Sequence, residues 1–233
     1  ESKRTTGKKN PRQIKAKTVI NEYGLITAVI NTYAPALDCT VKLPQIEHNQ
    51  HEISTPDVIY QIVKDTPIEL PALLAMWLSL TESEILGLTK SKSISSDGCY
   101  ITIKEVIVKD EHNNAVVKNK GKQPTRDRTL RLPEYLKQLI DKVETDQLVT
   151  LSGTALSKRF NRLITKAGIP HMTFHDLRHV NASVMAVLRI PDKYAQERGG
   201  WKTDHIMKST YMQTFSSERA AIDCLLYTSD AAD

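Results

Sequence analysis

Cysteine is scarce in this 233-residue chain, which contains only Cys39, Cys99 and Cys224. No two of them lie close in the sequence, so the chain carries neither a disulfide framework nor a thiolate zinc motif, and a reducing compartment is indicated. The longest strongly apolar run, residues 72–80, is about half of what a bilayer crossing needs, and no charged-then-apolar leader opens the sequence. We therefore expect a soluble, cytoplasmic protein without a membrane partner.

The composition also excludes several classes of protein. Hydrophobic residues make up 40% and charged residues 25% of the chain, close to the average of soluble globular domains. Extensive disorder and collagen-like repetition are therefore poor descriptions. The formal charge is +5, with a pI near 9.0, which suits a polyanionic partner. The last ten residues, 224–233, match the translation of a common sequencing adapter, and we expect them to be an artefact.

The pattern along the chain predicts two units with a boundary near Glu52. Residues 1–17 are strongly basic, residues 19–33 carry apolar side chains at helical spacing, and residues 39–51 read as a polar linker. A second unit is expected over residues 52–223. Its first helix begins after the N-cap Thr55, with Pro56 at the first helical position, and ends near Lys64, and a second helix covers residues 69–80.

The second unit is predicted to be an α+β domain. Residues 100–108 alternate as a strand, residues 110–114 form a polar turn, and residues 115–118 and 128–132 are further strands of one small antiparallel sheet. Everything after Pro133 is helical in pattern. The predicted helices cover residues 134–143, 155–167, 174–188, 192–197 and 204–215. The fold class is thus mostly helical with a peripheral sheet.

Histidine and arginine three residues apart mark a candidate anion site. Thr173 and Asp176 fit a variant of the capping box, which places the start of a helix just before His175. His175 and Arg178 then share one face in the first turns, where free N–H groups and the helix dipole favour a phosphate. Downstream come a Gly-Gly turn, Trp201 and, ten residues later, Tyr211.

The run Phe-His-Asp-Leu-Arg-His at 174–179, then Glu-Arg-Gly-Gly-Trp at 197–201, then Tyr211, resembles the signature of the tyrosine recombinases, particularly the integrases of temperate phages and conjugative transposons. The resemblance covers most of residues 55–223. Residues 14–33 are more weakly similar to the end of the family's preceding DNA-clamping, or core-binding, domain. The resemblance implies that the chain cuts and rejoins DNA through a 3′-phosphotyrosyl intermediate.

The resemblance also assigns roles to individual residues. It makes Tyr211 the nucleophile, Arg178 a clamp on the phosphate oxygens, and His175 a group that moves a proton or donates to the phosphate. Trp201 supplies an indole N–H and a rigid apolar wall. The family's general-acid lysine lies on a β-hairpin, where it protonates the leaving oxygen. Lys122 fits this position, with Lys120 as the alternative.

One position departs from the family. Its members carry a first arginine in a context such as Leu-Arg-x-Ser-Glu, where this chain has Thr81. Threonine lacks charge and reach, so one phosphate clamp is missing unless a cation such as Lys90 or Lys92 replaces it. Thr81 also fits a capping box with Glu84, in which case it only starts the next helix.

Two further patterns have competing interpretations. His171, His175 and His179 lie at helical spacing and imitate a zinc motif, but Arg178 would repel the ion, so we expect no metal and no cofactor. Around the predicted hairpin, six cations face the single acidic residue Asp127, which favours DNA contact over a solubility role. Besides Lys122, these predicted DNA-binding residues are Lys118, Lys120, Arg126, Arg128 and Arg131.

The sequence therefore predicts a site-specific recombinase that integrates or excises a mobile element. Its expected partner is double-stranded DNA, bound by four identical protomers on two sites, with accessory DNA-bending or excision factors and association with the nucleoid. Two alternatives remain open. One is a DNA-binding protein of the same descent whose catalysis is impaired by Thr81, and the other is a type IB topoisomerase.

Overall fold

The computed structural model describes residues 14–45, 53–119 and 128–201 together with residues 203, 205, 207 and 208. The chain divides into two compact units, Glu1–His51 and Glu52–Asp233. In the described parts of both, no helix combines the length and apolar character that a membrane span requires. Tyr211, Lys120, Lys122 and Arg126, and all but three residues of the predicted last helix, lie outside the described residues.

The first unit contains one helix, α1 (Ala16–Tyr33), which confirms the helix predicted there and starts it three residues earlier. None of its residues is buried, and Leu25 and Val29 are exposed. The Tyr23 hydroxyl donates a 2.8 Å hydrogen bond to the carbonyl of Cys39, which ties the following segment back to the helix. This helix therefore presents an apolar face that the described part of its own unit leaves uncovered.

The second unit opens with α2 (Pro56–Val63) and α3 (Glu69–Leu78), both close to their predicted ranges. Thr55 is the N-cap of α2, as predicted, but its side chain makes no capping hydrogen bond. Almost every residue of α3 is buried, so this helix runs through the centre of the unit. It ends at Ser79, which adopts a left-handed backbone conformation (φ 57°) and turns the chain toward the next helix.

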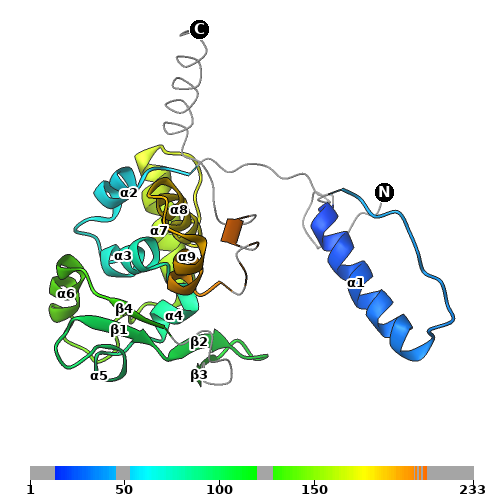
Figure 1. Cartoon of the computed structure of the whole chain (residues 1–233), viewed down its shortest axis with the longest axis horizontal. Helices are drawn as coiled ribbons and strands as arrows, with labels where there is room; N and C mark the ends of the chain where they lie inside the picture. The colour runs from blue at the N-terminus through cyan, green and yellow to red at the C-terminus, as the bar shows by residue number, and fades with distance from the viewer. Residues whose placement is uncertain are drawn as a thin grey trace, which may run out of the picture. The chain divides into compact units, whose positions relative to one another are not determined.

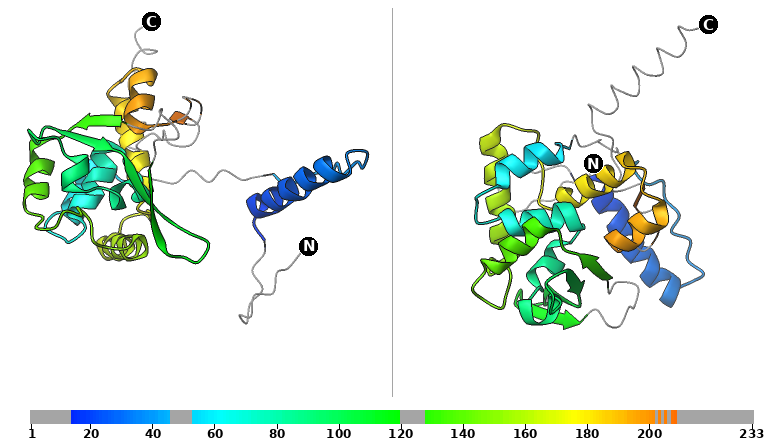
Figure 2. Two further views of the ribbon diagram at one scale, coloured as in Figure 1. Left: turned by 90° about the horizontal axis from the view of Figure 1, so that it is seen from below. Right: turned by 60° about the vertical axis from the view of Figure 1, so that its left-hand side comes forward.

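The predicted single sheet is wrong in one respect, because the strands form two separate antiparallel pairs. The alternating run at 100–108 breaks at Lys104 into β1 (Tyr100–Ile103) and β2 (Glu105–Lys109). β1 pairs with β4 (Arg128–Arg131), while β2 pairs with β3 (Ala115–Asn119). Alternation alone does not reveal a break at which the chain changes partners. The β2–β3 hairpin projects from the rest of the unit in Figure 1 and Figure 2.

Two short helices follow α3 that were not among the predicted elements. They are α4 (Glu82–Leu86) and α5 (Lys90–Ser93). The start of α4 does match the capping-box interpretation of Thr81. The later helices agree in kind with prediction and differ at their ends; they are α6 (Glu134–Asp141), α7 (Gly153–Ala167), α8 (Asp176–Val187) and α9 (Asp192–Gly199).

The core of the second unit has two parts. The larger cluster joins α2, α3, α4, α6, α7 and the start of α8 with the inner faces of β1 and β4. A smaller cluster comprises Ala182, Met185, Ala195, Trp201 and Met207, with Ile190 packed against it. It holds α9 and the turn that follows against α8. The expected α+β architecture, mostly helical with small antiparallel sheets, is thereby confirmed (Figure 1).

Candidate active site

The C-terminal end of α3 collects donors from three other elements. The last carbonyl groups of a helix have no partner within the helix and carry the negative end of its dipole, so they attract cations. The carbonyl of Ser79 accepts from Arg178 of α8 and from Nη2 of Arg128 of β4, the latter at 3.1 Å. The carbonyl of Trp77 accepts from Nη2 of Arg198 of α9 at 3.0 Å. Residues far apart in the sequence thus place three guanidinium groups around one helix end.

Arg178 lies in the middle of this arrangement. It is only 5% exposed, and its guanidinium carbon lies 4.6 Å from the centre of the Trp201 ring. This contact is a cation–π interaction, which holds the planar group in one orientation. Trp201 is itself 6% exposed and belongs to the smaller core cluster. The structure therefore brings together two of the predicted site residues, Arg178 and Trp201.

His175 precedes Arg178 by less than one helical turn. Surrounding protein, followed by the Arg178 charge, lowers the pKa of His175 below its ordinary value of 6.5, although much of the imidazole surface remains exposed. Its ring lies 5.6 Å from that of His179 in an edge-to-face arrangement. The imidazole is therefore neutral at pH 7 and can accept a proton.

The start of α8 differs from the predicted capping box. His175 is the N-cap, without a side-chain cap, and Thr173 lies two residues before it. The N–H of Asp176 already donates to the carbonyl of Thr173 at 3.0 Å, so the Thr173 hydroxyl does not accept it. Instead the Thr173 hydroxyl and N–H donate to the Asp176 carboxylate at 2.9 and 2.7 Å. The side chain of Asp176 thus accepts from Thr173, and these two bonds fix the turn.

Thr81 is the N-cap of α4 and takes part in a complete capping box. Its hydroxyl accepts from the N–H of Glu84 at 3.4 Å, and its own N–H donates to Oε2 of Glu84 at 2.8 Å. The cations considered as substitutes for an arginine here are occupied elsewhere. Lys90 donates to the carbonyls of Asp141 and Val143, and Lys92 pairs with Glu105 at 2.8 Å.

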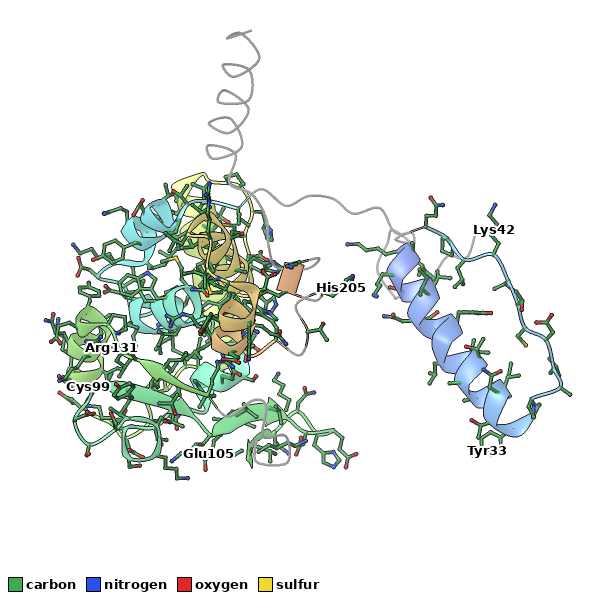
Figure 3. The ribbon with its side chains drawn as sticks, in the orientation of Figure 1. Tyr33, Lys42, Cys99, Glu105, Arg131 and His205 are labelled. Atoms are coloured by element: carbon green, nitrogen blue, oxygen red, sulfur yellow. The ribbon has the colours of Figure 1, made fainter. Side chains whose placement is uncertain are left out.

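Arg128 was predicted as a DNA-binding residue of the exposed basic run, but the structure buries it beside Arg178. It begins β4, is 9% exposed and donates to both carboxylate oxygens of Glu84, at 3.2 and 3.1 Å. By contrast, Arg131 and Lys118 are exposed, and Figure 3 places Arg131 at the end of β4 that adjoins α6. Arg128 shares the inner face of β4 with Leu130, so strand alternation was the signal that could have located it.

Glu84 and Gly200 are two further site residues that sequence reasoning missed. Glu84 is 4% exposed and joins Thr81 to Arg128 through one carboxylate. Gly200 has a left-handed backbone (φ +66°), and a Cβ at this position would lie 2.3 Å from Nη1 of Arg128. The turn at 199–201 therefore touches both arginines, Arg128 through Gly200 and Arg178 through Trp201.

A metal site is not formed by the described residues. In ranges 14–45, 53–119 and 128–201 and the few residues placed beyond, no group of three or more histidine, cysteine or acidic side chains could hold an ion. His179 lies 3.8 Å from Oδ1 of Asp176, which lies on the same helix, whereas His175 faces the Arg178 charge. The chemistry of this donor set is that of an anion site.

Comparison with known proteins places the chain among the integrases. The model of the phage integrase family matches residues 82–218, more than half of the chain. The integrase of Mycobacterium phage L5 is 22% identical over 226 residues, which are 87% of this chain and 61% of that protein. An integrase from Saccharopolyspora erythraea is 37% identical over 57 residues, 24% of this chain and 13% of the relative. The chain thus spans about three fifths of the L5 integrase.

Solved structures show the same fold. The integrase of transposon Tn1549, in complex with transposon right end DNA, has a TM-score of 0.71 at 17% identity, covering 91% of this chain and 80% of that one. The lambda integrase, bound as a dimer to a COC′ core site, has a TM-score of 0.54 at 18% identity, covering 86% and 65% of the two chains. With the family match and the buried arginine site, these findings identify the chain as a member of the phage integrase family of tyrosine recombinases.

Proposed function

We propose that this protein is a site-specific recombinase that cuts and rejoins double-stranded DNA in the integration or excision of a mobile element. The observation that carries the proposal is Arg178, buried, bound to the Ser79 carbonyl and stacked on Trp201. A guanidinium that is held in one orientation before the substrate arrives stabilises a phosphorane without reorganising. If α8 had only a structural role, the end of α3 would not need the guanidinium groups of Arg128, Arg178 and Arg198 together.

Tyr211 is the proposed nucleophile. Its phenolic oxygen attacks the scissile phosphorus and forms a 3′-phosphotyrosyl bond, while the bond between phosphorus and the 5′-oxygen breaks. The lowered pKa of His175 keeps its imidazole neutral and able to take the phenolic proton. Arg178 offers the two parallel donors that match two oxygens of the phosphate.

Lys122, or Lys120, is the proposed general acid, and it gives its proton to the departing 5′-oxygen. Rejoining reverses these steps when a 5′-hydroxyl of another strand attacks the phosphotyrosine. The bond to tyrosine conserves the energy of the broken phosphodiester, so the reaction consumes no nucleotide. Arginine, lysine and histidine provide the charge stabilisation, and we propose no metal or cofactor.

The proposed assembly is four protomers on two DNA sites. The Tn1549 and lambda integrases are bound to DNA in their structures, which supports DNA as the partner here. α1 belongs to what we propose is the end of a DNA-clamping domain, and residues 224–233 to an adapter artefact. The exposed Lys118 of β3 and Arg131 of β4 are proposed to contact the DNA backbone.

A covalent-capture experiment tests the function. The protein is incubated with duplexes selected for binding from a randomised pool, each nicked so that the short fragment released by cleavage is lost. A denaturing gel then reports protein linked to DNA. We expect a covalent band from the wild type and none from Tyr211→Phe, which removes only the phenolic oxygen and keeps DNA affinity.

The alternatives give different results in the same experiment. A DNA-binding protein without catalysis retains the selected duplexes but yields no covalent band. A type IB topoisomerase yields the band without sequence selection and relaxes supercoiled plasmid as a monomer. A band that persists in Tyr211→Phe contradicts the assignment of the nucleophile.

A further inference from the structure

The Arg128 guanidinium lies close to Thr81, the position at which this chain lacks the family's first arginine. The N–H of Thr81 and Nη2 of Arg128 both donate to Oε2 of Glu84, at 2.8 and 3.1 Å. The Arg128 guanidinium is therefore beside the backbone of Thr81, although it reaches that place from a strand 47 residues later in the sequence. It also shares the Ser79 carbonyl with Arg178, so the two guanidinium groups lie next to each other.

The guanidinium groups of Arg128, Arg178 and Arg198 gather at one helix end, where like charges repel one another. The Glu84 carboxylate pairs directly with Arg128, through Nη1 and Nη2. Burial, and then the charge of Arg128, lowers the pKa of Arg198. Buried cations in contact are costly unless an anion joins them. A phosphate bound between these guanidinium groups would reduce that cost.

Arg128 also has donors to spare. A guanidinium carries five N–H groups, and the bonds to Glu84 and Ser79 use three of them. Its Nε is buried and has no acceptor within the residues that the structure describes. Gly200, the residue before Trp201, leaves the space that the guanidinium fills, since a Cβ there would lie 2.3 Å from Nη1.

We propose that Arg128 is a catalytic residue that donates to a non-bridging oxygen of the scissile phosphate, in place of the arginine that position 81 lacks. Arg178 and Arg128 then form the two-guanidinium clamp, with Glu84 holding Arg128 and Thr81 serving only as a helix cap. This inference rests on the proposed function, and it goes further by naming the second clamp and its origin on β4.

The test replaces the charge of single phosphates in the DNA. A methylphosphonate has a methyl group in place of one non-bridging oxygen. It is therefore neutral and has one acceptor fewer for a guanidinium group. In a Tyr211→Phe background, binding is measured on selected duplexes that carry one methylphosphonate at each successive position. We expect binding by the Tyr211→Phe protein to weaken when the methylphosphonate is at one particular phosphate. Adding Arg128→Ala or Arg178→Ala should remove the sensitivity at that same phosphate.

Cleavage provides the second measurement. With Tyr211 restored, Arg128→Ala should slow single-turnover cleavage of the natural phosphodiester by ~10²-fold, the usual effect of removing one transition-state donor. Cleavage of a duplex with a methylphosphonate at the cut position should slow by less than ~10-fold. A residue that only supports the fold would slow both substrates by the same factor. Equal factors, or sensitivity lost at a different phosphate from Arg178→Ala, would overturn the proposal.

Two further variants keep the test decisive. Arg131→Ala removes the same charge from the exposed end of the same strand, and its effect should be equal on the two substrates. Arg128→Lys retains a cation beside Glu84 and protects folding if the alanine variant is unstable. It should still lose part of the preference for the charged phosphate, because lysine lacks the planar fork.

The two proposals fail in different ways. If the wild type forms no covalent band, the recombinase function fails, whereas the binding scan still decides whether Arg128 and Arg178 share a phosphate. If the band forms and the scan separates the two arginines, the function stands and the role of Arg128 falls.

Discussion

The second unit contains two sets of positively charged side chains, one exposed and one buried. On the β2–β3 hairpin and at the outer end of β4, cations such as Lys118 and Arg131 are exposed to water. At the C-terminal end of α3, Arg128 and Arg178 are buried and held by carbonyl and carboxylate oxygens. Exposed cations interact with DNA through a screened, sequence-independent attraction. In the proposed function, buried and oriented guanidinium groups act on one phosphate, so we expect the first set to govern affinity and the second to govern rate.

The largest effect should come from the centre of the buried set. Arg178→Ala removes the guanidinium stacked on Trp201, and single-turnover cleavage should fall by ~10²- to 10³-fold while DNA affinity changes much less. Rate is measured on the nicked duplex and affinity by gel shift. Arg159→Ala on the exposed face of α7 is the control and should cleave normally. A loss of affinity as large as the loss of rate would erase the distinction between the two sets.

Displacing Arg128 without changing it is the next test. Gly200→Ala places a Cβ 2.3 Å from Nη1 of Arg128 and forces alanine into a left-handed conformation. We expect ~10-fold slower cleavage from the misplaced donor and a stability loss of about 1 kcal/mol from the backbone.

Gly168→Ala is a matched control for that substitution. Gly168 has the same left-handed backbone, φ +67°, but nothing lies within 4 Å of its Cβ position. It should show the same loss in thermal unfolding and unchanged cleavage. Equal cleavage by both variants would mean that the contact with Gly200 does not position Arg128.

The exposed set should respond to salt. Lys118→Ala should reduce the slope of log affinity against log salt concentration by about 1, with a few-fold weaker binding at moderate salt. Lys118→Arg keeps the charge and should keep the slope. An unchanged slope in the alanine variant would show that this cation is solvated and does not contact phosphate.

The smallest effect concerns pH and stability. The pKa of His175 is lowered by its surroundings, so the unfolded chain binds a proton more readily than the native one below pH 6.5. The free energy of unfolding should therefore decrease as the pH falls through 6.5. The decrease should be small because the His175 side chain is exposed. His175→Gln should flatten that part of the stability curve in urea titrations between pH 7.5 and pH 5.5. A curve identical to that of the wild type would contradict the lowered pKa.

Much of the architecture was readable from the sequence because its signals are local. Helical spacing located α1, α7 and α8, and Thr55-Pro56 located the start of α2. The change of partner at Lys104 could not be read, because β1 pairs with residues at least 25 positions later, whereas β2 pairs with the nearby strand β3. The shift at Thr173 arose because a backbone bond competed with the expected cap.

The site was predictable only where its residues are close in the sequence. His175, Arg178 and Trp201 lie within 27 residues, and Arg178 and Trp201 are in contact. Glu84 was missed, and Arg128 was predicted only as a DNA contact, because a charge at a helix start or in a basic run is ordinarily solvated. Only the tertiary structure shows that these two are buried together. Tyr211 and Lys122 remain predictions.

Because Arg128 lies on a strand, its position in the proposed clamp depends on the register of the sheet. Arg128 pairs with Ile103 at one end of the four-residue β1–β4 ladder. A slip of one residue would turn Arg128 to the opposite face and bring Thr129 inward. An arginine on the turn after α3 would be placed by its own neighbours, whereas this one is placed only when two distant strands have paired correctly. If Arg128 holds the phosphate as proposed, the site is complete only when β1 and β4 have paired in this register.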